Sequence, residues 1–95
     1  KTEVTGSHTI AGTYLGEVAN AKACIVKKTA KPTVGWAFTD PLASVLINNH
    51  QFSVNADFPG DSKTYWLVVG HYDNAQGQHV ADAVFAYSML TTNEG

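Results

Sequence analysis

The feature that most constrains the fold is a pair of β-prone segments that flank a turn near the C-terminus. Residues 65–72 and 78–89 read with period two, as strands do, and the residues DNAQG at 73–77 separate them. Asp, Asn and Gly are the residue types that turns require, and connections of about five residues often join antiparallel strands. The pattern predicts a β-hairpin.

This hairpin also predicts a strand register, in which Tyr72 faces Gln78. One face then sets large side chains against small ones or histidine against histidine, in the pairs His71–His79, Val69–Ala81, Leu67–Ala83 and Tyr65–Phe85. The other face consists of the pairs Gly70–Val80, Val68–Asp82 and Trp66–Val84. A shift by one residue would mix the two faces, so we expect a specific register.

Other parts of the chain show the same alternation. It occurs in residues 21–28, 33–38 and 52–55, and more weakly in residues 9–18, where glycines interrupt it. Turn-forming residues separate these segments, so six or seven strands are expected. This pattern is typical of an all-β sandwich or small barrel, and 95 residues suit a single domain over 1–95.

One segment departs from the β pattern. Asp40 occupies a candidate helix N-cap position, and Pro41 follows at the first helical position. Leu42, Val45 and Leu46 have helical spacing, although the same residues are compatible with a turn followed by a strand. We expect a short helical turn near 40–46 that leads into a strand.

The charge composition argues against a nucleic-acid partner. All six basic residues are lysine, arginine is absent, and the formal net charge is −2. Arginine makes the bidentate contacts to phosphates and bases on which most such interfaces depend. The cluster of Lys27, Lys28 and Lys31 is interpreted as a solvated strand end. Membrane insertion is not expected, because no apolar run approaches the roughly 20 residues of a membrane span.

The sequence carries no catalytic or cofactor-binding motif of a known local type. It contains neither G-x-S-x-G nor H-E-x-x-H, and it lacks a glycine-rich phosphate loop. The single cysteine, Cys24, lies in an apolar run and is interpreted as a buried small hydrophobe. We therefore expect a protein that is not an enzyme and binds no cofactor or metal. A second hypothesis is a small metal-dependent protein in which His71 and His79, side by side in the predicted register, hold the ion.

The aromatic residues indicate a binding surface. In the predicted hairpin Trp66 and Tyr72 share one face, next to the turn residues Asp73 and Asn74. If that face is exposed, these residues form a site that stacks on sugar rings or anchors a protein partner. A third hypothesis is a small-ligand-binding β-barrel with Trp36, Tyr65 and Phe85 lining its cavity.

Residues 64–77 and 81–87 together resemble the last hairpin of immunoglobulin-like extracellular modules. The resemblance implies an antiparallel immunoglobulin-like β-sandwich. It also implies a non-catalytic binding or structural module that serves adhesion or the recognition of carbohydrate or protein. A charge-poor composition rich in Thr and Asn fits a secreted or cell-surface protein, and Lys1 at the start fits a mature protein or one domain of a larger surface protein.

Overall fold

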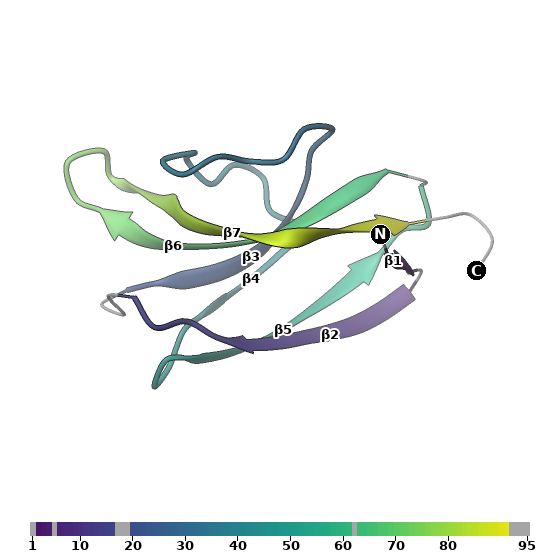
Figure 1. Ribbon diagram of the computed structural model, residues 1–95, viewed down its shortest axis with the longest axis horizontal. Coiled ribbons are helices and arrows are strands. Elements are labelled where there is room, and N and C mark those ends of the chain that lie inside the picture. Colours follow the sequence, from purple (N-terminus) through teal and green to yellow (C-terminus); the bar gives the residue numbers. More distant parts are fainter. Residues whose placement is uncertain (1, 5, 17–19, 62, 92–95) are drawn as a thin grey trace.

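The computed structural model is all-β, with two sheets packed face to face (Figure 1). It describes residues 2–4, 6–16, 20–61 and 63–91, of which 2–4 and 83–91 are described by their backbone alone. The strands are β1 (Thr2–Val4), β2 (Gly6–Thr13), β3 (Lys22–Lys27), β4 (Ala43–Leu46), β5 (Gln51–Phe58), β6 (Thr64–Asp73) and β7 (Gln78–Thr91). Among these residues no helix is long and apolar enough to cross a membrane.

The larger sheet has the strand order β1-β7-β6-β3-β4, and the smaller sheet pairs β2 with β5. All pairs are antiparallel except that of β1 with β7, which is parallel. The all-β prediction and the strands predicted around 21–28, 52–55, 65–72 and 78–89 are therefore confirmed.

The main core lies between the two sheets. Along β5 every second residue is buried, in the order Phe52, Val54, Ala56 and Phe58. These side chains pack against residues of the larger sheet such as Ile25, Leu67 and Val69. Because each fully buried Val or Phe side chain contributes about 1.5–3 kcal/mol, this strict alternation fixes which face of β5 points inward.

The outer face of the larger sheet is covered by the long connection between β3 and β4, residues 28–42 (Figure 1). Trp36 and Phe38 of this connection pack, together with Trp66, over a small cluster of buried residues: Cys24, Val26, Val68 and Ala81. Backbone hydrogen bonds hold the connection against β7, since Ala81 N donates to Trp36 O (2.8 Å) and Phe38 N donates to His79 O (2.9 Å).

Two predictions for this part of the chain are wrong. The alternation at 33–38 does not form a strand of its own, because only Ala37 makes a β-bridge there, with Val80. The helical turn predicted near 40–46 is absent, and Ala43–Leu46 is β4. Asp40 has a left-handed backbone (φ 44°), which an N-cap residue does not adopt. Pairing with β3 decides the outcome, as Val45 lies opposite Ala23.

The predicted hairpin exists, but its register is wrong. Asp73 pairs with Gln78 and Tyr72 with His79, so every partner next to the turn is displaced by one residue. The reason is local: Gly77 N donates to Asp73 O (2.8 Å), and Gly77 has a positive φ of 70°, which closes a tighter turn than the predicted one.

Two irregularities then increase the displacement along the hairpin. Val69 pairs with Ala83 while Gly70 pairs with Ala81, so Asp82 is the extra residue of a β-bulge. Beyond a second irregularity, Tyr65 pairs with Met89 rather than with Phe85. Sequence alternation cannot reveal such insertions, because each bulge changes the pairing without changing the strand.

Candidate functional site

Four aromatic rings follow one another on the outer face of the larger sheet. The centroid distances are 6.1 Å from Trp36 to Phe38, 5.8 Å from Phe38 to His79 and 5.1 Å from His79 to Tyr72. All four side chains are partly accessible, and Tyr72 is 36% exposed. We call Trp36, Phe38, His79 and Tyr72 the aromatic strip.

The strip draws on three separate segments, and the backbone holds them in place. Trp36 and Phe38 lie on the β3–β4 connection, which is hydrogen-bonded to β7. Tyr72 and His79 are direct cross-strand partners in β6 and β7, and their rings meet edge to face at 70°. Because every ring is positioned by paired backbone, the strip is organised before any ligand binds.

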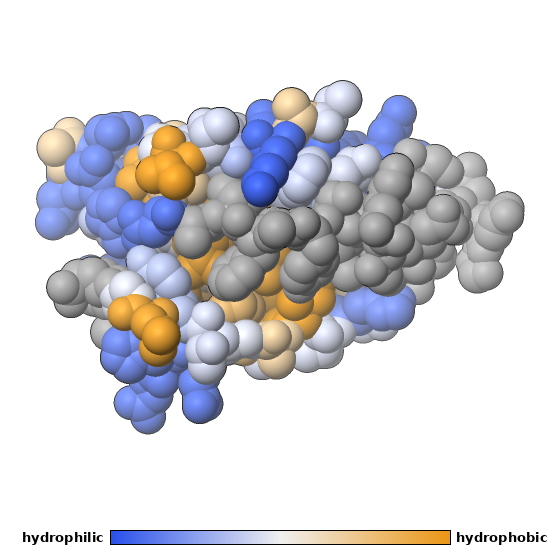
Figure 2. Space-filling view, viewed as in Figure 1, coloured by the Kyte–Doolittle hydropathy of each residue, from blue (hydrophilic) through white to orange (hydrophobic). Residues whose placement is uncertain are grey.

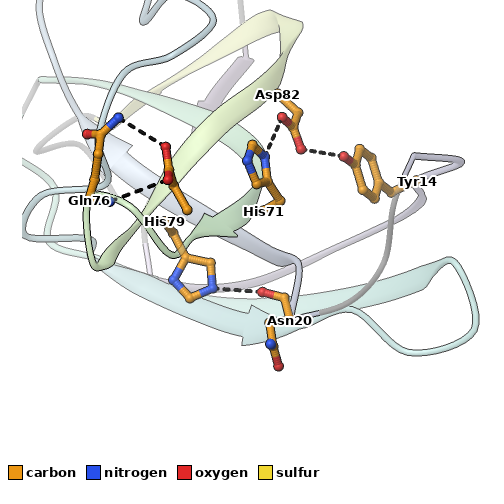
Figure 3. Close-up of polar contacts among 7 residues, drawn as sticks. Tyr14, Asn20, His71, Gln76, His79 and Asp82 are labelled. Carbon is orange, nitrogen blue, oxygen red and sulfur yellow. Dashed lines mark hydrogen bonds and ion pairs between the residues drawn. The ribbon is translucent and has the colours of Figure 1, made fainter.

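His79 has a second anchor. Its Nε2 lies 2.7 Å from the backbone oxygen of Asn20 (Figure 3). A carbonyl oxygen only accepts hydrogen bonds, so Nε2 carries the proton and donates. This bond fixes the orientation of the imidazole, whose ring stacks on Phe38 with an interplanar angle of 25°.

The two ends of the strip differ in chemistry. At the Tyr72 end, a small pocket of about 260 Å³ is lined by Asn20, Leu46, Tyr72 and His79. At the other end, the Lys28 ammonium lies 5.3 Å from the centroid of the Trp36 ring, within the range of a cation–π interaction. The strip therefore runs from a partly apolar pocket to a positive charge.

The turn at 73–77 is held by its own side chains. Asp73 Oδ1 accepts hydrogen bonds from the backbone nitrogens of Ala75 (2.9 Å) and Gln76 (3.3 Å). Asp73 Oδ2 accepts from Gln76 Nε2 (3.1 Å), as drawn in Figure 3. The Asp73 carboxylate therefore orders the turn, whereas Asn74 is exposed at its tip.

The structure brings three of the four predicted site residues to one end of the sheet. Tyr72, Asp73 and Asn74 are adjacent there, but Trp66 lies six residues back along β6, about 20 Å away for an extended strand. Trp66 is half-buried against the outer cluster, and its Nε1 donates to Lys28 O (2.9 Å). The sequence did not predict His79 as the partner of Tyr72, because the predicted register was wrong, and it did not predict Phe38 beside His79, because only the fold of the β3–β4 connection brings these two together.

A separate polar network ties the two sheets together. Asp82, the bulged residue of β7, accepts a hydrogen bond from the Tyr14 hydroxyl (2.6 Å) at Oδ2, and its Oδ1 lies 2.7 Å from His71 Nδ1 (Figure 3). Tyr14 follows β2 and belongs to the main core, so the contact joins the smaller sheet to β7. The network is part-buried and bridges the two sheets, which indicates a structural role for its side chains.

The corrected register separates the two histidines of the hypothetical metal site. His71 pairs with Val80 and Tyr72 with His79, so the side chains of His71 and His79 point to opposite faces of the hairpin. His71 contacts Asp82, while His79 contacts Asn20 and two aromatic rings. In the part of the chain that the structure describes, no three His, Cys, Asp or Glu side chains are grouped closely enough to hold a metal ion.

The structure also separates residues that a small-ligand barrel would need to bring together. Trp36 packs on the outer face, whereas Tyr65 belongs to the main core, so they do not line one cavity. The side chain of Phe85 lies outside the described residues.

The single cysteine lies in the outer cluster and is fully buried. Burial raises the pKa of the Cys24 thiol from 9.0 to about 12, against a smaller lowering by Lys22. The thiol is therefore protonated at neutral pH and is not poised as a nucleophile.

The aromatic strip is thus the arrangement with the clearest capacity to bind a ligand. It offers a row of partly exposed rings, a pocket at one end and an ammonium group at the other. Comparison of the chain with protein-family models, with curated proteins and with solved structures found no match.

Proposed function

We propose that this chain is a non-catalytic recognition module that binds carbohydrate through the aromatic strip. The observation that carries the proposal is the row of four rings, held by backbone pairing yet left partly open to solvent. Sugar rings present faces of C–H groups, which are attracted to the electron-rich faces of aromatic rings. A row of rings at 5–6 Å spacing offers several such contacts to an extended sugar chain.

The exposure of the strip supports binding over a purely structural role. A core that needs only to be closed would bury these rings, as the main core buries Phe58 and Tyr65 to 2% exposure. Figure 2 shows small hydrophobic patches among polar residues at one end of one face and a longer hydrophobic band along its middle. Trp, Tyr and His are not hydrophobic on that scale, so the case for the strip depends on the ring contacts and exposure given above.

Polar groups beside Tyr72 supply the second element of sugar recognition. The amides of Asn74, Gln76 and Gln78 are exposed around the turn, and Gln78 Nε2 donates to Gln76 Oε1 (3.1 Å). Amide groups both donate and accept hydrogen bonds, as sugar hydroxyls do. Of the predicted residues, Tyr72 and Asn74 enter this proposal as direct contacts and Asp73 as the residue that orders the turn. Trp66 packs on the same outer cluster as Trp36 and Phe38 and is not proposed as a contact.

The cellular setting belongs to the same proposal. A secreted or cell-surface location, and a place within a larger multidomain surface protein, are supported by the low charge content of 15% and the absence of arginine. We also propose that the fold is an immunoglobulin-like sandwich. The seven strands of the described residues, arranged in two sheets, favour this fold. Their division into sheets of five and two strands differs from the sheets of four and three strands that are usual in immunoglobulin domains.

The test is a panel of oligosaccharides titrated into the folded domain by isothermal calorimetry, with Tyr72→Ala as the first variant. Tyr72 is the most exposed ring of the strip, so its removal should leave folding intact and weaken binding about tenfold. The matched control is Leu15→Ala, because Leu15 is 86% exposed and lies outside the strip. Equal binding by wild type, Tyr72→Ala and Leu15→Ala, or no binding to any sugar, would contradict the proposal.

A further inference from the structure

Three lysines line one hollow at the end of the larger sheet where β3 finishes and β6 begins. Lys27, Lys28 and Thr29 contribute from one segment, Lys63 and Thr64 from the other, and the hollow has a volume of about 500 Å³. The backbone nitrogen of Lys28 donates a hydrogen bond to the backbone oxygen of Thr64 (3.1 Å), and this bond holds the two segments together. The volume lies within the range of about 300–1,000 Å³ that is usual for ligand sites.

Positive charge exceeds negative charge among the described residues around this hollow. Lys27 Nζ lies 3.5 Å from Asp61 Oδ2, and the same carboxylate accepts a hydrogen bond from the Tyr65 hydroxyl (2.9 Å). One carboxylate beside three ammonium groups leaves an excess of two positive charges. The chain as a whole carries a formal charge of −2, so the local charge around the hollow is opposite in sign to the net charge of the protein.

The hollow adjoins the Trp36 end of the aromatic strip, because Lys28 lines the hollow and also contacts Trp36. The Lys28 ammonium group lies 5.3 Å from the centroid of the Trp36 ring. A ligand that follows the strip from Tyr72 to Trp36 therefore reaches the lysines next. Lys31, on the same connection, lines a separate hollow together with Pro32, Thr33 and Val34.

We infer that the ligand of the aromatic strip is an acidic polysaccharide, whose sugar rings lie on the strip and whose carboxylate or sulfate groups bind in the lysine-lined hollow. This inference rests on the proposed function and names the class of sugar. Lysine is a compact point charge without the planar geometry of arginine, so it suits anionic oxygens spread along a flexible chain. The absence of arginine argues against a nucleic acid, which also combines stacking with phosphate contacts.

The experiment compares neutral glucose, uronic-acid and sulfated oligosaccharides of equal length by isothermal calorimetry, together with an oligothymidylate. The variants are Lys28→Gln and Lys63→Gln, and the control is Lys22→Gln at the opposite end of β3. We expect tighter binding of an anionic sugar than of the neutral one, and a loss of about two- to fivefold for each lysine variant. Added salt should weaken the anionic complex alone. The uronic-acid and sulfated arms identify which anion the hollow takes.

The two hypotheses fail in different ways. Equal affinity for neutral and anionic sugars, with Lys63→Gln behaving like Lys22→Gln, would overturn the acidic ligand and leave the strip as the sugar site. No binding to any sugar, or tighter binding of the oligothymidylate, would overturn both. Lys63 is exposed and outside the strip, so a folding defect in Lys28→Gln would still leave Lys63→Gln as a valid test.

Discussion

The two faces of the five-stranded sheet bury apolar side chains by different means. On the inner face, a second sheet covers residues such as Val69 with strictly alternating side chains from β5, and both partners are almost fully buried. On the outer face, the irregular β3–β4 connection covers Cys24, Val26, Val68 and Ala81, and its aromatic residues stay half-exposed. A sheet-to-sheet contact closes a core, whereas a single connection closes a face only in part and leaves rings available for a ligand.

This contrast predicts that equivalent substitutions on the two faces have unequal effects on stability. Phe58 is 2% exposed and packs edge to face on Tyr65 at 5.3 Å, so Phe58→Ala should lower the free energy of unfolding by about 3–5 kcal/mol. Phe38→Ala, on the partly open face, should cost less than about 2 kcal/mol. Urea unfolding of both variants measures the difference. Equal costs would show that the outer face is as closed as the inner one.

Gly70 lies where the hairpin changes register, and it offers a sharper test of the bulge. A Cβ atom at this position would overlap the backbone oxygen of Val80, so the backbone of β7 would have to move. Gly70→Ala should therefore destabilise the fold by about 1–3 kcal/mol. Thermal unfolding measures the size of the effect. Another glycine such as Gly35 cannot serve as a control, because its positive φ of 90° would itself make an alanine there unfavourable. If Gly70→Ala melted at the same temperature as the wild type, the bulge would be absent.

The polar network should have a smaller effect, since it joins the two sheets at one point only. Asp82→Ala removes the acceptor of the Tyr14 hydroxyl and the partner of His71 Nδ1. The expected cost is about 1–2 kcal/mol, measured by urea unfolding. Tyr14→Phe removes one of the two contacts and keeps the ring in the core, so it should cost less than Asp82→Ala. The reverse order would show that the ring, rather than the network, carries the stability.

Burial on the two faces can also be compared through alkaline titration. On the outer face, burial raises the pKa of Cys24 to about 12. On the inner face, the pKa of Tyr65 is raised to about 12 by burial, by the hydrogen bond to Asp61 and by the negative charge of Asp61. Above pH 9.0 the unfolded chain loses the Cys24 proton while the folded protein keeps it, so the free energy of unfolding falls as the pH rises towards 12. Below pH 9.0 the thiol is protonated in both states and the effect vanishes.

The corresponding variant is Cys24→Ala, which removes the titrating thiol. Its stability should fall less steeply than that of the wild type between pH 9.0 and 12. Urea unfolding at a series of pH values measures both slopes. Identical slopes would mean that the thiol ionises as readily in the folded state as in the unfolded one.

The part of the fold that sequence predicted is the part that alternation determines. In β5 the residues Phe52 and Val54 alternate with Ser53 and Asn55, and this pattern predicted a strand there. The structure extends the same alternation to Phe58. The alternation at 33–38 misled the prediction, because Trp36 and Phe38 use it to cover a sheet rather than to join one.

The hairpin register and the candidate site depended on features that alternation does not encode. The turn closed at Asp73 displaced the partners of β6 by one residue, so His71 and His79 lie on opposite faces, and the bulge at Asp82 displaced the partners further along the hairpin. Tyr72 was identified from the sequence, but His79 becomes its partner only in the observed register, and Phe38 reaches His79 only through the tertiary path of the β3–β4 connection. Side chains brought together over such separations leave no local signal.

The most direct test of a ligand on the outer face uses Trp36 as a reporter. Trp66→Phe leaves Trp36 as the single tryptophan of the chain, and acrylamide is a neutral quencher that does not compete with an anionic sugar. Titration of this variant with a uronic-acid or sulfated oligosaccharide should protect Trp36 from quenching, with the same midpoint as the heat of binding. Unchanged quenching at sugar concentrations that saturate the calorimetric signal would place the ligand elsewhere and contradict the account.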